Sequence, residues 1–96
     1  MRTMLTIKMP VGPSNRAVQD GSLGKIFEAT MADLKPECAY FFPQDGKRSA
    51  VFVFDMKNSE DTARIAERFF VGLDAEVSFT PVMNGEDLKK GLSDHS

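Results

Sequence analysis

The sequence predicts a single α+β domain over residues 1–96, in which a four-stranded antiparallel sheet has two helices on one face. Two apolar runs, 38–42 and 50–54, are joined by a polar segment with Asp45 and Gly46, a dipeptide typical of tight β-hairpins. One amphipathic helical pattern lies on each side of this hairpin, and a further strand pattern precedes the first helix and follows the second. This strand–helix–strand–strand–helix–strand order is that of a ferredoxin-like sandwich.

The first strand is expected near 4–9, where three apolar residues, Leu5, Ile7 and Met9, occupy alternate positions. Successive side chains of a strand point to opposite faces of the sheet, so these three define the buried face. The segment 10–13, which has two prolines and a glycine, is expected to end the strand. Such a pattern suits a sheet that is covered by helices on one side.

The first helix is expected from about Ser14 or Ser22 to Lys35, followed by a proline that stops it. Its buried stripe recurs at helical spacing and consists of Leu23, Ile26, Phe27, Thr30, Met31 and Leu34. Gly21 and Gly24 each weaken a helix, by about 1 kcal/mol relative to alanine. A start at Ser22 would therefore leave the segment before it as a loop or a frayed turn.

The second helix is expected to begin at a cap formed by Asn58 or Ser59, with Glu60 and Asp61 near the positive end of its dipole. Gly72 is expected to stop it. The buried stripe consists of Thr62, Ile65, Ala66, Phe69, Phe70 and Leu73.

The last strand is expected near 76–82, with Val77 and Phe79 facing the helices. Pro81 is tolerated there because this topology places the fourth strand at a sheet edge. The spatial order of the four strands is then 4-1-3-2. A short capped helix is expected to follow over 84–92.

The charge balance gives no sign of a nucleic-acid or membrane partner. Twelve basic and 14 acidic residues leave a net charge of −2. The chain also has no leader pattern and no apolar stretch approaching the roughly 20 residues of a membrane span, so we expect a cytoplasmic protein.

Cys38 is the single cysteine and is expected to be a buried small hydrophobe. His95, the single histidine, lies in the tail and is expected to be inert.

The two central apolar runs predict a face of the sheet that no helix covers. Phe52 and Phe54 alternate with Val51 and Val53, so this strand is apolar on both faces. Two helices cover one face, and several hundred Å² of apolar surface on the other would favour association. We therefore expect a homodimer joined through the open sheet face. The alternative is that the C-terminal segment folds over this face and leaves a monomer.

A few polar side chains are candidates for a ligand pocket. Lys8, Tyr40, Arg48 and Arg16 could line a site for an acidic or aromatic small molecule, although each also suits a strand end or a helix surface. Asp55 ends the third strand and either faces the pocket or leads into the next turn. The sequence offers no metal-ligand cluster and predicts no cofactor.

Six short motifs carry a family resemblance. They are Asp20-Gly21, Leu34-Lys35-Pro36-Glu37, Tyr40-Phe41, Gln44-Asp45-Gly46-Lys47-Arg48, Asp74-Ala75-Glu76-Val77 and Glu86-Asp87-Leu88. Over nearly its whole length the chain resembles a group of short, uncharacterised bacterial proteins of ferredoxin-like, dimeric α/β-barrel type. The resemblance implies that fold and a side-by-side sheet dimer, and no activity. Wider relatives include cofactor-free monooxygenases and small lyase-like proteins, whose pockets rely on Trp, His or a His–Asp pair. This chain has no Trp and one His.

Three hypotheses about function follow. The first is a cytoplasmic homodimer that binds a small molecule in a pocket between the open sheet face, the loop after the first strand and the C-terminal segment. The second is a cofactor-independent enzyme acting on a hydrophobic or aromatic substrate. It requires Tyr40, Asp55 and Arg48 to converge in a cavity and the carboxyl group to be buried. The third is a structural or protein-interaction module with a flat interface and no pocket.

Overall fold

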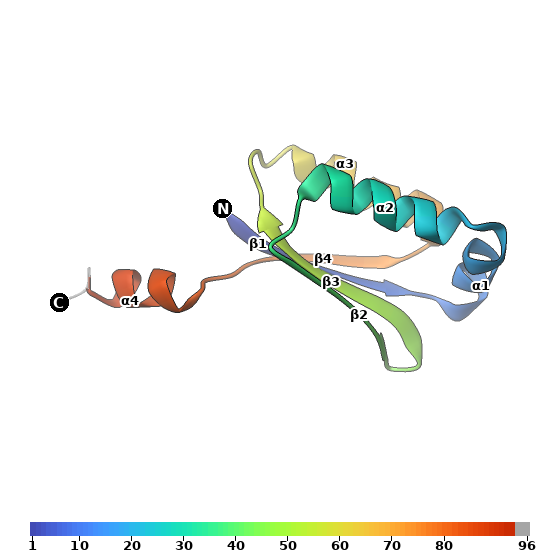
Figure 1. Ribbon diagram of the computed structural model, residues 1–96, viewed down its shortest axis with the longest axis horizontal. Helices are drawn as coiled ribbons and strands as arrows, with labels where there is room; N and C mark the ends of the chain where they lie inside the picture. Colours follow the sequence, from blue (N-terminus) through green and yellow to red (C-terminus); the bar gives the residue numbers. More distant parts are fainter. Residues whose placement is uncertain (94–96) are drawn as a thin grey trace.

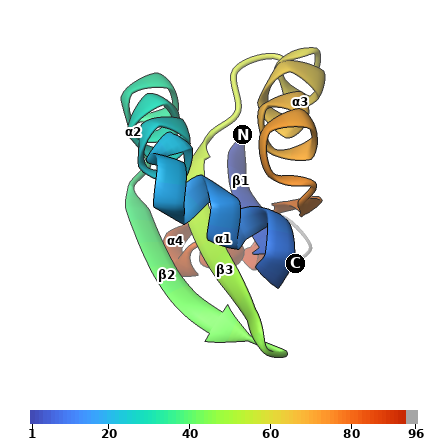
Figure 2. The ribbon, with the colours of Figure 1, turned by 90° about the vertical axis from the view of Figure 1, so that its right-hand side faces the viewer.

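The computed structural model describes residues 1–93 and confirms an α+β fold built on a four-stranded antiparallel sheet. The strands are β1 (Arg2–Met9), β2 (Cys38–Gln44), β3 (Lys47–Asp55) and β4 (Glu76–Pro81). The helices are α1 (Val11–Asp20), α2 (Ser22–Leu34), α3 (Asp61–Leu73) and α4 (Gly85–Ser93). Helices α2 and α3 lie side by side over one face of the sheet, and α1 crosses at one end (Figures 1 and 2). His95 lies outside the described residues.

The predicted hairpin and strand order are confirmed. Asp45 and Gly46 form a two-residue turn between β2 and β3, with φ angles of 55° and 73°. Positive φ at both central residues is the requirement of the tight hairpin turn that matches the twist of a sheet. The strands lie in the order β2-β3-β1-β4, which is the expected 4-1-3-2 order read from the other edge.

The strand register divides the sheet into a helix side and an open side. Leu5 of β1 is paired with Phe52 of β3, and Ile7 with Ala50, and all four side chains are buried under the helices. The intervening β3 residues therefore point to the opposite side. The core consists of Leu5, Ile7, Met9, Ala17, Ala50, Phe52, Phe54, Ile65, Phe69, Leu73 and Ala75.

The predicted first helix is in fact two helices. Gly21 has a φ angle of 83°, which ends α1 and precedes the first residue of α2. The backbone N–H of Ser22 donates to the Asp20 carboxylate at 2.8 Å, which stabilises the break. The segment before α2 is thus an ordered helix instead of a loop, because it buries Ser14 and Ala17. Of the predicted α2 stripe, Met31 is exposed.

Gly72 does not end α3 as predicted. The helix continues to Leu73 and is terminated by Asp74, whose φ angle is 51°. A Cβ atom at Gly72 would lie 2.9 Å from Cδ1 of Ile26 in α2, so this glycine is a point of close approach between the two helices. Phe70, another member of the predicted stripe, is 42% exposed.

The C-terminal helix α4 lies beyond the end of the sheet (Figure 1) and does not cover the open side. It begins with a reciprocal cap, as predicted: the N–H of Asp87 donates to the Asn84 side chain at 2.8 Å, and the N–H of Asn84 donates to the Asp87 carboxylate at 3.1 Å. Leu88 and Leu92 are exposed. No helix within residues 1–93 has both the length and the apolar character needed to cross a bilayer.

Two adjacent phenylalanines of α3 provide a test of the core. Phe69 is fully buried and lies 6.1 Å, ring centre to ring centre, from Phe27. We expect Phe69→Ala to lower the free energy of unfolding by about 3–5 kcal/mol, because a large cavity replaces the ring. The neighbouring Phe70→Ala change is the control and should cost much less. Chemical denaturation measures both, and equal losses would contradict this packing.

Candidate functional site

The open side of the sheet has an apolar half and a polar half. The apolar half lies on β2 and β3 and consists of Cys38, Tyr40, Phe42, Val51 and Val53, with Met4 of β1 beside them. The polar half lies on β1 and β4 and consists of Thr6, Lys8, Glu76, Ser78 and Thr80. Tyr40 is 63% exposed, and Cys38, which was expected to be buried, is half-buried. Residues 1–93 place no helix over this side (Figure 1).

Lys8 and Tyr40 lie on the open side, in adjacent rows of side chains. Lys8 donates to the Asp45 carboxylate at 2.7 Å. This hydrogen bond raises the pKa of Lys8 and lowers the pKa of Asp45 from their ordinary values. Asp45 therefore both forms the predicted turn and neutralises the lysine. Tyr40 pairs in register with Val51, one row away from Lys8.

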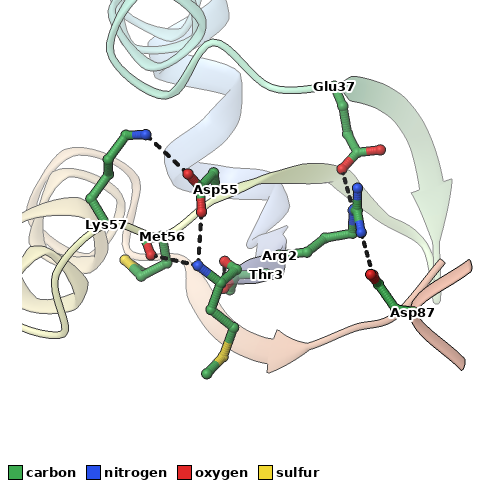
Figure 3. A network of polar contacts seen from close by, with 8 residues as sticks. Arg2, Thr3, Glu37, Asp55, Met56, Lys57 and Asp87 are labelled. Atoms are coloured by element: carbon green, nitrogen blue, oxygen red, sulfur yellow. Dashed lines mark hydrogen bonds and ion pairs between the residues drawn. The ribbon is translucent and has the colours of Figure 1, made fainter. Parts of the chain in front are cut away.

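Asp55 lies at the other end of β3, as the centre of an exposed cluster of ion pairs (Figure 3). One carboxylate oxygen accepts a hydrogen bond from the N-terminal ammonium at 2.7 Å, and the other accepts one from Lys57 at 2.9 Å. These two cations, the N-terminal ammonium first, lower the pKa of Asp55 to about 2. The carboxylate is therefore ionised at neutral pH and is a weak base, unlike the buried group that the enzyme hypothesis requires.

A neighbouring ion-pair cluster ties α4 to the sheet. Arg2 donates to Glu37 at 2.6 Å and also to Asp87 of α4 (Figure 3). The hydrogen bond to Glu37 is the main reason that the pKa of Arg2 is raised. Exposed pairs of this kind contribute little stability. Their role here is to fix the start of α4 beside β1.

Arg48 lies on the helix side of the sheet, opposite Lys8 and Tyr40. In β3 it pairs with Met9 and Pro43, whose side chains lie on that side. Its Nη1 donates to Ser14 Oγ at 2.7 Å and to Asn15 Oδ1 at 2.9 Å, both in α1. The predicted ligand residues Lys8, Tyr40, Arg48 and Asp55 therefore do not converge within one chain. Asp55 also lies seven residues from Arg48, roughly 23 Å along an extended strand.

Arg48 borders an apolar groove between α2 and the hairpin, which we call the helix-side groove. Its volume is about 360 Å³, and its lining residues are Met9, Leu23, Phe27, Phe41, Phe42, Pro43, Arg48 and Ser49. Sequence reasoning missed Ser14, Asn15, Phe27 and Phe41 as neighbours of Arg48. The available signal was the even numbering that Arg48 shares with the core residues Phe52 and Phe54, since alternate residues of one strand share a face.

A second cavity, between α2, α3 and the end of β3, is lined by charged side chains, most of which pair with one another. Asp33 of α2 accepts hydrogen bonds from Arg64 and, at 2.9 Å, from Arg68, both in α3. The Arg64 contact is the main reason that the pKa of Asp33 is lowered. These pairs hold the two helices together.

Among residues 1–93, no group of three or more His, Cys, Asp or Glu side chains is arranged to hold a metal ion.

Comparisons with known proteins provide no relative from which a function could be transferred. No family model, no curated protein and no solved structure matches this chain.

The Asp55 cluster predicts a pH dependence. Because the folded-state pKa is depressed to about 2, the stabilisation from this group is present above its ordinary value of 3.8 and is lost as the pH falls through the folded value. We expect its carboxyl carbon to titrate near 2 by NMR, and Asp55→Asn to lose stability less steeply than the wild type between about pH 4 and 2. A titration midpoint near the ordinary value would contradict the cluster.

Proposed function

We propose that this protein acts as a homodimer of the ferredoxin-like, dimeric α/β-barrel type, joined through the open sides of two sheets. The observation that supports it most is the apolar half of the open side. Val51 and Val53 are half-buried there, and Tyr40 and Phe42 are exposed. At about 25 cal/mol per Å² of apolar surface removed from water, covering such a patch strongly favours association. A second copy supplies a matching apolar surface.

Two-fold symmetry makes this pairing self-complementary, since each chain presents the same patch to the other. Sheets that pack face to face are about 10 Å apart, the distance that interdigitated side chains fill. The apolar half provides such side chains. The exposed Leu88 and Leu92 of α4 give a further apolar surface that a second chain could cover.

The polar half of the open side is the place we propose for a small-molecule ligand within this dimer. Thr6, Ser78 and Thr80 have short side chains and would leave space between two packed sheets. Their hydroxyl groups both donate and accept hydrogen bonds. Lys8 lies in this polar half, whereas Tyr40 lies on β2, at the far edge of the same side of the sheet. We also propose a cytoplasmic location, which the single cysteine supports, since it permits no disulfide within the chain.

Native mass spectrometry of protein purified from a cell lysate tests assembly and ligand together. A dimer mass with a small adduct is the expected result, and the adduct identifies the ligand class. A dimer without an adduct would favour the protein-interaction module over the binding protein. A monomer would contradict both the dimer and the ligand site that depends on it.

A pair of valine variants tests the interface itself. Val51→Lys places a charge in the apolar half of the open side, and we expect it to convert the dimer to a monomer because an unpaired charge is costly to bury. Val71→Lys is the matched control, since Val71 lies on α3 and is 80% exposed. Light scattering coupled to size-exclusion chromatography gives both masses. A dimeric Val51→Lys protein would place the interface elsewhere.

A further inference from the structure

We propose that the helix-side groove binds a small molecule with an apolar body and a carboxylate head, and that Arg48 recognises the head. Six of its eight lining residues belong to the helix side of the sheet or to α2, opposite to the proposed dimer interface, and the other two, Phe42 and Ser49, alternate toward the open side. The inference therefore goes beyond the proposed function and does not depend on dimer formation. It rests on two independent observations, one about the walls of the groove and one about the charge at its rim.

The walls of the groove contain two aromatic rings, and a buried ring of the core holds them in place. Phe27 of α2 and Phe41 of β2 meet edge to face, with ring centres 5.2 Å apart. Both rings also contact the buried Phe52, at 6.0 Å and 5.8 Å. Phe41 is nevertheless 56% exposed, so its ring is available to a ligand. The groove volume of about 360 Å³ falls in the range of natural small-molecule sites, roughly 300–1,000 Å³.

Arg48, at the rim of the groove, differs from the other half-buried basic residues in having no acidic partner among residues 1–93. Five basic side chains in residues 1–93 are half-buried, and four of them lie within ion-pair distance of a carboxylate: Arg2, Lys8, Lys47 and Arg68. Arg48 is the fifth, and no carboxylate of residues 1–93 lies within ion-pair distance of its guanidinium. Its two side-chain acceptors, Ser14 Oγ and Asn15 Oδ1, are neutral. They orient the guanidinium without neutralising it.

The geometry favours an oxyanion, such as the carboxylate head of the proposed ligand, over a neutral acceptor. Both hydrogen bonds of Arg48 to α1 use Nη1, which leaves its Nε and Nη2 donors for a ligand. A guanidinium presents such donors as a planar fork that matches the two oxygens of a carboxylate. Since the remainder of the lining is apolar except for Ser49, an aryl or alkyl carboxylate matches both parts of the groove.

The test compares two molecules of nearly the same shape, 2-naphthylacetate and its neutral amide, by NMR titration of the full-length protein. We expect the carboxylate to bind about tenfold more tightly than the amide, as a charge-assisted pair permits. Backbone amide shifts should cluster at α2 and the hairpin. Equal affinities, or shifts confined to the open side, would overturn the proposal.

Two variants, each with a matched control, assign the roles within the groove. Arg48→Met should abolish the preference for the carboxylate, and Arg16→Met should retain it because Arg16 is outside the groove. Phe41→Ala should weaken both molecules alike, whereas Phe70→Ala should weaken neither. Thermal unfolding shows which variants are folded. If Arg48→Met does not fold, Arg48→Gln removes the charge with a polar side chain in its place, and an unchanged preference in either folded variant would overturn the assignment.

The monomerising Val51→Lys variant separates this proposal from the dimer. Because the groove lies on the other side of the sheet, this variant should bind 2-naphthylacetate as tightly as the wild type. Loss of binding in a folded Val51→Lys protein would contradict the proposed location, whatever the oligomeric state of the wild type.

Discussion

The alternation of side chains along β3 is the constraint on which the other features of this protein depend. Its even-numbered residues Phe52 and Phe54 pack under the helices, and its odd-numbered residues Val51 and Val53 point to the open side. A chain of this size has too few helices to cover both sides, because α1 crosses at the sheet end and α4 lies beyond it (Figure 1). The same strand thus builds the core and leaves an apolar surface facing outward.

The charged groups around this strand mostly form ion pairs between neighbouring elements. The pairs of Asp33 with Arg64 and Arg68 join α2 to α3, and the pair of Lys8 with Asp45 joins β1 to the hairpin turn. Each pair is accounted for by its role in the fold. Arg48 differs because its partners are neutral, which is why it supports an inference about ligands and the others do not.

Much of the fold could be predicted from the sequence because its signals are local. The turn at Asp45 and Gly46, the buried faces of β1 and β3, and the cap of α4 each depend on a few adjacent residues. The role of Gly72 could not be predicted in this way, since it depends on the Ile26 side chain of another helix.

The candidate site was harder to predict than the fold for the same reason. The parity of β3 assigns Arg48 to the side of Phe52, but only the placement of α1 shows that Ser14 and Asn15 orient it. The separation of Asp55 from Tyr40 likewise follows from strand pairing, whereas its separation from Arg48 follows from their spacing along β3.

The two edge strands of the sheet differ from the two inner strands in one residue type. β2 and β4 each have a proline near the carboxyl end, Pro43 and Pro81, whereas the inner strands β1 and β3 have none. A proline has no backbone N–H, so neither edge presents an unbroken row of donors to another strand. Edge-to-edge growth into fibrils is thereby opposed at both borders of the sheet. The proline of β2 thus opposes aggregation on the edge strand that carries the exposed Phe41 and Phe42.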